Sequence, residues 1–327
     1  MKRAGQLIEK IADIDNLLLA YRKARRGKQY KKSVREYSEN LFSNIALLRS
    51  NILSGSVDVG NYHYFKIFDP KERLISAATF SERVLHHAIM NVCQPVFERH
   101  LIYDTYATRE GKGIYKAIDK ARLAMRKYNY VAKLDVRKYF DSISHKILKV
   151  KLRGLFKDTK LIEILEKIID SYCAHTQKGI PIGNLTSQYF ANYYLSHLDH
   201  YIKENLKTPV YIRYMDDMLL FADTKKMLDE YVSKVENYLQ EEVHLQLKPV
   251  VKQSTCYGIS FLGYKLYKNK ILLNGRSKKR LKSKIFQYES NRINGNWSEV
   301  AYIQHITPLL AYAQKAYSKR LICSLLV

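Results

Sequence analysis

The fold is decided by the stretch Tyr211-Ile212-Arg213-Tyr214-Met215-Asp216-Asp217-Met218-Leu219-Leu220-Phe221, which places two adjacent carboxylates between two β-prone segments. This pattern predicts two short strands over 211–222 around an acidic turn. Water solvates most Asp-Asp pairs, and a motif this short also recurs by chance. A hairpin tip backed by apolar strands would instead hold the like charges together, which is costly without a cation. The stretch therefore predicts a cation site at a hairpin tip.

A further carboxylate, Asp135, ends a second predicted strand over 131–136. If this strand neighbours the hairpin, Asp135, Asp216 and Asp217 converge as hard oxygen ligands at one end of a sheet. Mg²⁺ prefers such ligands and completes its octahedron with substrate phosphates and water. Two ions about 3.5–4 Å apart would activate a primer 3′-hydroxyl and stabilise the pyrophosphate leaving group. The constellation predicts phosphoryl transfer with two Mg²⁺ ions, for which Mn²⁺ is the expected substitute.

Composition indicates a nucleic-acid partner. The 327 residues include 56 Lys and Arg against 31 Asp and Glu, a formal charge of +25, and such an excess opposes compaction unless a polyanion screens it. Hydrophobic residues make up 46% of the chain, which fits a globular protein. The four cysteines form no CxxC pair, which argues against a zinc cluster. No run approaches the roughly 20 apolar residues of a membrane span, so we expect a cytoplasmic protein without a membrane partner.

Periodicity predicts a mixed α/β body with a basic helical tail. A basic stretch occupies 22–32, and a loop rich in Gly and Pro lies at 179–183. Helical spacing recurs over 7–21, 41–53, 80–96, 117–128, 147–172, 185–205, 228–243 and from 277 onward. Strand patterns cover 62–68, 130–136, 245–247, 260–267 and 270–273.

The order of these motifs resembles that of reverse transcriptases over about residues 65–267. The fingers motifs are matched by Lys71-Glu72-Arg73-Leu74-Ile75 with Phe80-Ser81-Glu82-Arg83-Val84, and by Tyr106-Ala107-Thr108-Arg109-Glu110-Gly111-Lys112-Gly113. The palm motifs are matched by Lys133-Leu134-Asp135-Val136-Arg137-Lys138-Tyr139-Phe140-Asp141 and Tyr214-Met215-Asp216-Asp217, and the primer grip by Gly258-Ile259-Ser260-Phe261-Leu262-Gly263-Tyr264.

A narrower resemblance lies in Gly179-Ile180-Pro181-Ile182-Gly183-Asn184-Leu185-Thr186-Ser187-Gln188. Most bacterial relatives carry Gln in place of Ile182 and Ser-Pro in place of Ser187-Gln188. The version found here is typical of the reverse transcriptases of diversity-generating retroelements. A retron or group II-like reverse transcriptase is the alternative. A non-catalytic RNA-binding protein on the same scaffold would be expected to lose Asp135, Asp216 and Asp217, and all three are present.

The resemblance implies an α+β fold, the polymerase right hand with fingers, a palm of antiparallel sheet plus helices, and a short helical thumb. It also implies copying of a template-repeat RNA into adenine-mutagenised cDNA from dNTPs on a cDNA primer-template, together with a basic accessory variability protein. The expected boundaries are an N-terminal basic helical extension at 1–32, fingers at 33–129 with an insert at 142–178, palm at 130–141 and 179–268, and thumb at 269–327.

Roles for individual residues also follow from the resemblance. Val136 joins the three aspartates as a metal ligand, and Phe140 takes the place of the steric gate that excludes a ribose 2′-hydroxyl. Either Lys248 or Lys252 would protonate pyrophosphate, and Lys252 is the one expected among the catalytic residues. The residues expected to contact nucleotide or template are Lys71 and Arg73 on the triphosphate, and Pro181, Ile182, Gly183, Gln188, Tyr214 and Met215 around the nascent pair.

Overall fold

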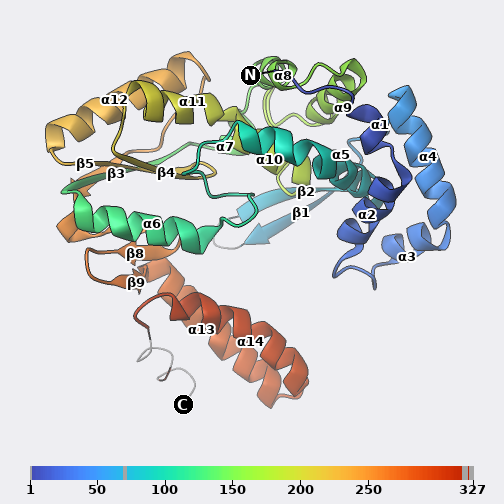
Figure 1. The fold of residues 1–327 in the computed structure, drawn as a ribbon. Coiled ribbons are helices and arrows are strands. Elements are labelled where there is room, and N and C mark those ends of the chain that lie inside the picture. The colour runs from blue at the N-terminus through green and yellow to red at the C-terminus, as the bar shows by residue number, and fades with distance from the viewer. Residues whose placement is uncertain (1, 69–71, 319–322, 324–327) are drawn as a thin grey trace. The chain divides into compact units, whose positions relative to one another are not determined.

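The computed structural model describes residues 2–68, 72–318 and 323 (Figure 1). The chain forms two compact units. The first comprises residues 1–103, 136–201 and 237–246, and the second comprises residues 104–135, 202–236 and 247–327. Each unit is therefore assembled from three separate stretches of chain.

A four-stranded antiparallel sheet in the second unit confirms the predicted hairpin. Its spatial order is β4 (Val210–Tyr214), β5 (Asp217–Ala222), β3 (Tyr130–Asp135) and β6 (Val251–Ser254). All three strand pairs are antiparallel. Apart from Asp217, β5 is buried along its whole length, as expected for a central strand.

Helix α6 (Ile114–Lys127) covers one face of this sheet (Figure 1). It buries Ala117, Ile118, Ala121 and Met125 at helical spacing, in one cluster with sheet residues such as Leu219. The alanines bring the helix backbone close to the strands. The sheet therefore has a rigid support directly under the hairpin.

The outer edge of β4 is covered by a short segment, Asp104 to Tyr106. Arg213 donates its amide to the Asp104 carbonyl at 3.0 Å, and the Tyr106 amide donates to the Arg213 carbonyl at 2.9 Å. Thr105 thereby forms a parallel bridge with Arg213. The opposite edge strand, β6, is only four residues long.

The C-terminal part of the second unit is a small sheet followed by two helices. Strands β7 (Ile259–Phe261), β8 (Tyr264–Leu266) and β9 (Ile271–Leu273) pair in sequence order. Helices α13 (Gly275–Ile293) and α14 (Glu299–Gln314) then lie side by side (Figure 1). Leu281, Ile285 and Ala313 form their small core.

Two strand predictions need correction. The segment predicted as one strand over 260–267 is a hairpin, because Leu262 and Gly263 adopt positive φ values of 47° and 89°, which reverse the chain. No strand forms over 245–247. The Leu245 amide donates to the Leu239 carbonyl at 2.8 Å and closes the preceding helix, and pairing with β3 begins later, in β6.

The first unit combines a helical core with the antiparallel hairpin β1 (Tyr62–Phe68) and β2 (Glu72–Ala78). Its longest helix, α5 (Phe80–Arg99), begins at Thr79, whose side chain accepts from the Glu82 amide. The other helices are α1 (Ile8–Ile11), α2 (Ile14–Arg25), α3 (Lys32–Glu39), α4 (Leu41–Ser54), α7 (Tyr139–Ser142), α8 (His145–Leu155), α9 (Thr159–Asp170), α10 (Leu185–Tyr194) and α11 (Ser196–His200).

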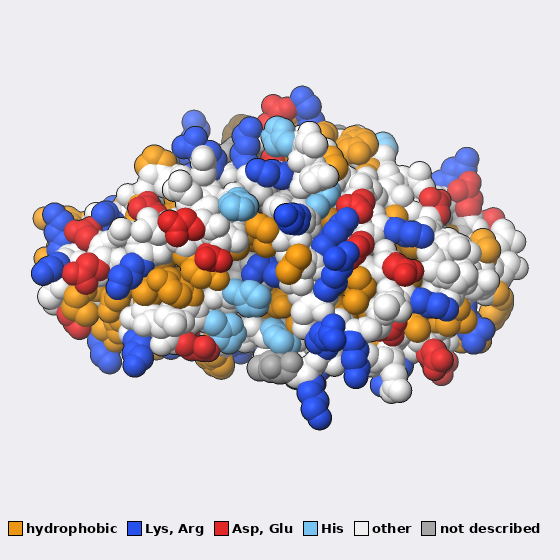
Figure 2. All heavy atoms as spheres, turned by 90° about the horizontal axis from the view of Figure 1, so that it is seen from above, with side chains coloured by type: hydrophobic (Ala, Val, Ile, Leu, Met, Phe, Trp, Pro, Cys, Tyr) orange, Lys and Arg blue, Asp and Glu red, His pale blue; other side chains and the backbone are white. Residues whose placement is uncertain are grey.

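Three further elements complete the chain: the π-helix η1 (Tyr201–Asn205), helix α12 (Lys225–Glu241) and the 3-10 turn η2 (Thr255–Tyr257). No helix in the described part of the chain is long and apolar enough to cross a bilayer. Lys and Arg side chains are spread over the face shown in Figure 2 instead of forming a single patch.

Candidate active site

The carboxylates predicted from the sequence meet at one end of the four-stranded sheet. Asp135, the last residue of β3, stands directly opposite Asp217, the first residue of β5. Asp216 lies in the two-residue turn that joins β4 to β5. The side chains of Asp135 and Asp217 remain 28% and 29% exposed, so solvent ions can reach them.

The turn that carries Asp216 has a strained backbone. Met215 has a φ of 58°, in the left-handed region that a side chain with a Cβ rarely adopts. Its carbonyl accepts a hydrogen bond of 3.0 Å from Nη1 of Arg213, a residue with no exposed surface. This buried guanidinium group anchors the turn from below and fixes where Asp216 points.

Burial and the nearby negative charges raise the pKa of the two hairpin carboxylates, Asp216 and Asp217. Burial, followed by the charges of Asp217 and Asp135, raises the pKa of Asp216 to about 6. The pKa of Asp217 is also raised, mainly by burial, although the ammonium group of Lys133 opposes the rise. The hairpin tip thus concentrates negative charge that only cations can stabilise at neutral pH.

Two lysines supply cations in the structure. The Lys248 ammonium group donates a hydrogen bond to Asp135 Oδ1, and the Lys248 amide donates to the Asp135 carbonyl at 2.8 Å. Lys133 Nζ lies 3.2 Å from Asp217 Oδ1. Lys252, in contrast, forms a 2.6 Å ion pair with Asp229. Of the two lysines considered as proton donors, Lys248 is the one that contacts the carboxylates.

The donor set fits a hard divalent cation. Asp217 Oδ1 is buried, with Lys133 Nζ 3.2 Å away, so a divalent cation bound there would take over the charge compensation that this ammonium group supplies. Among the described residues, no three His, Cys, Asp or Glu side chains are already arranged around one point as metal ligands. Mg²⁺ needs only one or two protein carboxylates when phosphates and water complete its shell. Asp135, Asp216 and Asp217 are the residues that would hold it.

In the first unit, Arg73 of β2 and Ile182 line a common cavity of about 580 Å³. Its wall also includes Lys138, a residue with a positive φ of 44°, and Asp141. The cavity is large enough for a nucleotide-sized ligand. The structure thus brings together two of the residues predicted to contact the incoming nucleotide.

The other described residues of the first unit that were predicted to contact nucleotide, template or metal do not line this cavity. Pro181 is buried, Phe140 is half-buried and Gln188 is exposed. Gly183 has a φ of 118°, and a Cβ at this position would lie 2.9 Å from Ile75 Cγ2, so this close approach requires glycine. Val136 is fully buried. Lys71 lies outside the described residues.

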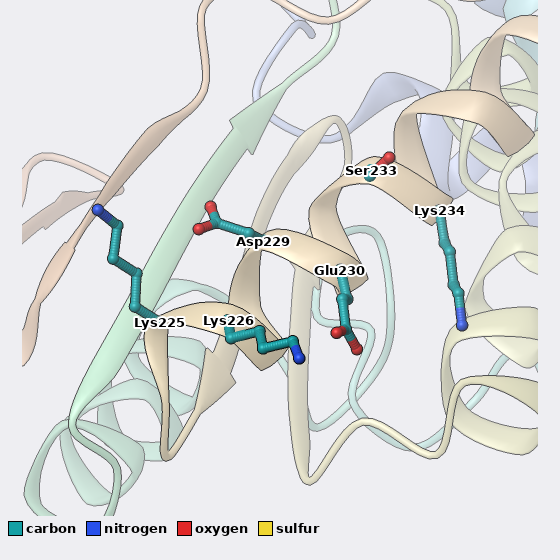
Figure 3. Close-up of a pocket in the computed structure, with 6 residues that line it drawn as sticks. All are labelled: Lys225, Lys226, Asp229, Glu230, Ser233 and Lys234. Carbon is teal, nitrogen blue, oxygen red and sulfur yellow. The ribbon is translucent and has the colours of Figure 1, made fainter.

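A larger surface hollow, of about 790 Å³, runs along α12 and offers no comparable chemistry. Figure 3 shows its six lining side chains projecting from this one helix in several directions. The charges are mixed, and one of the carboxylates, Asp229, is already paired with Lys252. The hollow is an open groove beside a solvated helix.

Sequence reasoning missed the roles of Lys133 and Arg213. Lys133 lies two residues before Asp135, so strand alternation alone places both side chains on one face, and this signal was present. Burial of Arg213 had no such signal, because an arginine between β-prone residues usually faces solvent.

Comparison with known proteins agrees with this geometry. Residues 68–266 match the family described as reverse transcriptase (RNA-dependent DNA polymerase). The chain is 21% identical to the putative COX1/OXI3 intron 2 protein of Saccharomyces cerevisiae, an alignment covering 79% of this chain and 38% of that protein. It is 22% identical to protein YkfC of Escherichia coli, over 49% of this chain and 45% of that protein. The chain therefore spans less than half the length of these relatives.

Among solved structures, apo telomerase from Candida tropicalis is similar with a TM-score of 0.53 at 14% identity, covering 71% of this chain and 53% of the telomerase chain. The same telomerase in complex with the TWJ fragment of telomeric RNA gives a TM-score of 0.51, covering 81% of this chain and 56% of that chain. These similarities establish the fold alone.

The family match extends over more than half of the chain, and the chain belongs to the reverse transcriptase family. The α+β fold of the polymerase class is confirmed. RNA-directed DNA polymerase, the enzyme class predicted from the sequence, is the class of this family. Reverse transcriptase domains generally use divalent metal ions, in agreement with the carboxylate chemistry.

Proposed function

We propose that this protein is an RNA-directed DNA polymerase that extends a primer by two-metal nucleotidyl transfer. The observation that supports this most directly is the register of β3 and β5, in which Asp135 faces Asp217 beside a turn that holds Asp216. Mg²⁺, or Mn²⁺ in its place, would supply activation of the primer 3′-hydroxyl and neutralisation of the phosphates. The ligands would be the three aspartates, with Val136.

The chain's own residues would perform the remaining tasks. Arg73 would bind triphosphate oxygens through its forked guanidinium group. Lys248 would give its proton to the leaving pyrophosphate, since its ammonium group already contacts Asp135. Lys252, the other candidate, would first have to leave Asp229. Phe140 would act as the steric gate, and Tyr214 and Met215 would lie beside the primer end.

The narrower proposal is an enzyme of a diversity-generating retroelement. It would copy a template-repeat RNA into adenine-mutagenised cDNA, work with a basic accessory variability protein and act in the cytoplasm. Ile182 and the Ser187-Gln188 pair support this assignment. The names of curated relatives as intron proteins favour an intron-type enzyme as the second candidate. The presence of paired template and variable repeats beside the gene would favour the diversity-generating enzyme over the intron-type enzyme.

The predicted subdivision into fingers, palm and thumb is part of the proposal. The β1–β2 hairpin is consistent with fingers, the four-stranded sheet with palm, and α13 with α14 with a thumb. The predicted boundaries are 1–32 for the extension, 33–129 and 142–178 for fingers, 130–141 and 179–268 for palm, and 269–327 for thumb.

Primer extension tests the activity. Purified protein, a primed RNA template and dNTPs should yield full-length cDNA with Mg²⁺ or Mn²⁺, and none with excess EDTA. Substitution of dNTPs by NTPs should abolish extension. Failure to extend any primed RNA with either ion, by protein that is folded in circular dichroism, would contradict the proposal.

A further inference from the structure

The loop Gly179 to Asn184 is attached to two different parts of the first unit by hydrogen bonds. On one side, the Ile180 amide donates to the Phe140 carbonyl at 3.0 Å. On the other, the Ser76 amide of β2 donates to the Ile182 carbonyl at 3.0 Å. The loop is thus a bridge between β2 and the segment that carries Phe140.

Asn184 adds a side-chain hydrogen bond to the attachment between the loop and β2. It occupies the N-cap position of α10, yet its side chain does not cap that helix. Its Oδ1 instead accepts a hydrogen bond of 3.2 Å from the Ala78 amide at the end of β2. Asn184 is 1% exposed, so the bond is shielded from water.

This arrangement has a cost within the protein. The Asn184 Nδ2 group is buried without a hydrogen-bond partner in the described structure. A buried, unsatisfied amide destabilises the folded state, and an apolar residue of similar size would avoid that penalty. The use of Asn here is explained if the acceptor for Ala78 is needed for something other than stability.

We propose that Asn184 is a positioning residue that sets the distance between Ile182 and Arg73 across the 580 Å³ cavity. Arg73 lies on β2 and Ile182 on the loop, so the Asn184–Ala78 bond joins the two walls that these side chains line. This inference rests on the proposed polymerase function, because it assigns the cavity to the incoming nucleotide. Asn184 itself touches neither substrate nor metal.

The test compares Asn184→Ala with Thr186→Val, two residues further along in the first turn of α10. Thr186 is fully buried and its hydroxyl group has no partner in the described structure, so the valine variant perturbs local packing without touching the bridge. We expect Asn184→Ala to raise KM for dNTPs about 5- to 10-fold, the loss expected for one buried hydrogen bond. Its kcat should stay within about twofold of wild type, and misincorporation should increase. Asn184→Asp keeps the hydrogen-bond acceptor, so its KM for dNTPs should lie closer to the wild-type value than that of Asn184→Ala.

Equal KM values for Asn184→Ala and Thr186→Val, or a loss confined to kcat, would overturn the proposal. Hydrogen exchange gives a readout that needs no activity, because the Ala78 amide should exchange faster in Asn184→Ala than in Thr186→Val. If the wild-type protein makes no DNA, the proposed function fails. Hydrogen exchange at the Ala78 amide then tests by itself whether Asn184 attaches the loop to β2. Unchanged exchange at Ala78 would then refute it, and faster exchange would support it.

Discussion

Lys248 contacts Asp135 twice, through its ammonium group on the carboxylate and through its amide on the Asp135 carbonyl. The backbone contact holds the lysine beside the carboxylate even when the side chain moves. A cation that binds Asp135 would compete with the ammonium group for the carboxylate, while the backbone contact would keep Lys248 beside the site.

Removal of Lys248, the proposed proton donor, should slow the chemical step. We expect Lys248→Ala to lower kcat for primer extension by about 10²-fold, at the low end of general acid catalysis, with a smaller change in KM. Lys252→Ala is the matched control, because that lysine pairs with Asp229, and it should lose less than about threefold. Single-turnover kinetics would measure both. A larger defect in the Lys252 variant would reverse the assignment.

Asp216→Asn should abolish metal-dependent extension while stabilising the metal-free protein. The folded-state pKa of Asp216, about 6, lies above the ordinary 3.8, so its ionised form is disfavoured by folding. Stability is then lost as the pH rises from about 4 to 6, and Asn removes that loss. Solvent screening at this half-buried turn reduces the effect, so we expect the free energy of unfolding of Asp216→Asn to be about 1–2 kcal/mol higher than that of wild type at pH 7.

Urea denaturation in EDTA would measure this gain, with exposed Asp223→Asn as the control. Normal extension by Asp216→Asn would remove Asp216 from the metal ligands.

Lys151 gives a pH-dependent prediction away from the carboxylates. This lysine is buried, and its Nζ lies 2.6 Å from His197 Nδ1. Burial lowers its pKa from 10.5 to about 8, although Glu242 and Asp199 oppose the shift. Between pH 8 and 10.5 the unfolded chain holds a proton that the folded protein has released, so the free energy of unfolding rises with pH across that window.

Lys151→Met should remove this rise with pH, and its free energy of unfolding at pH 7 should exceed that of wild type by about 1–2 kcal/mol. The exposed Lys146→Met on the same helix should follow wild type. Parallel curves for wild type and Lys151→Met between pH 8 and 10.5 would contradict the buried ammonium group.

The basic face of α13 should bind the phosphates of the template-primer. Lys278, Lys279 and Lys282 are all exposed there. Their replacement by Gln should flatten the slope of log K against log salt by about 2–3, at about 0.9 per duplex contact or 0.7 per single-strand contact. Removing three charges from the basic stretch 22–32 should act similarly. Replacing Lys225, Lys226 and Lys234 of α12 is the control, and an equal effect there would show that binding is nonspecific.

Ile182 should limit fidelity. An aliphatic side chain at this position cannot hydrogen-bond near the nascent base pair. The loss of one positioning contact reduces the free-energy difference between the transition states for correct and incorrect nucleotides by about 1–3 kcal/mol. We expect Ile182→Gln to lower misincorporation opposite template adenine while polymerisation continues. Ile182→Leu should leave the errors unchanged. Sequencing of cDNA made on one adenine-containing template would measure them, and equal errors for active Ile182→Gln and wild type would place the cause elsewhere.

Local signals predicted the hairpin and its supporting helix. The strands over 211–222 and the apolar spacing of α6 are patterns of neighbouring residues, so both could be read without tertiary information. The proximity of Asp135 to Asp217 required one assumption, that β3 and β5 are neighbours, and the structure meets it.

Strand β2 escaped notice because its first three residues, from Glu72 to Leu74, are exposed and show no alternation of polar and apolar side chains. Contacts that depend on the path of the chain were also beyond prediction. Lys248 and Asp135 are separated by 113 residues along the chain, and the Asn184 bond to Ala78 likewise joins residues far apart in the sequence.

The way in which the four-stranded sheet ends on each side bears on how the protein behaves when concentrated. An open strand edge is a template for aggregation, because its free amide and carbonyl groups pair with another chain. Here β4 is shielded by the Asp104–Tyr106 segment, and β6 is short and carries Lys252. The β4 edge therefore offers no free amide or carbonyl of Arg213 to another copy of the protein while those contacts last. Aggregation through the β4 edge would require detachment of the Asp104–Tyr106 segment, so the two backbone hydrogen bonds of Arg213 contribute to colloidal stability.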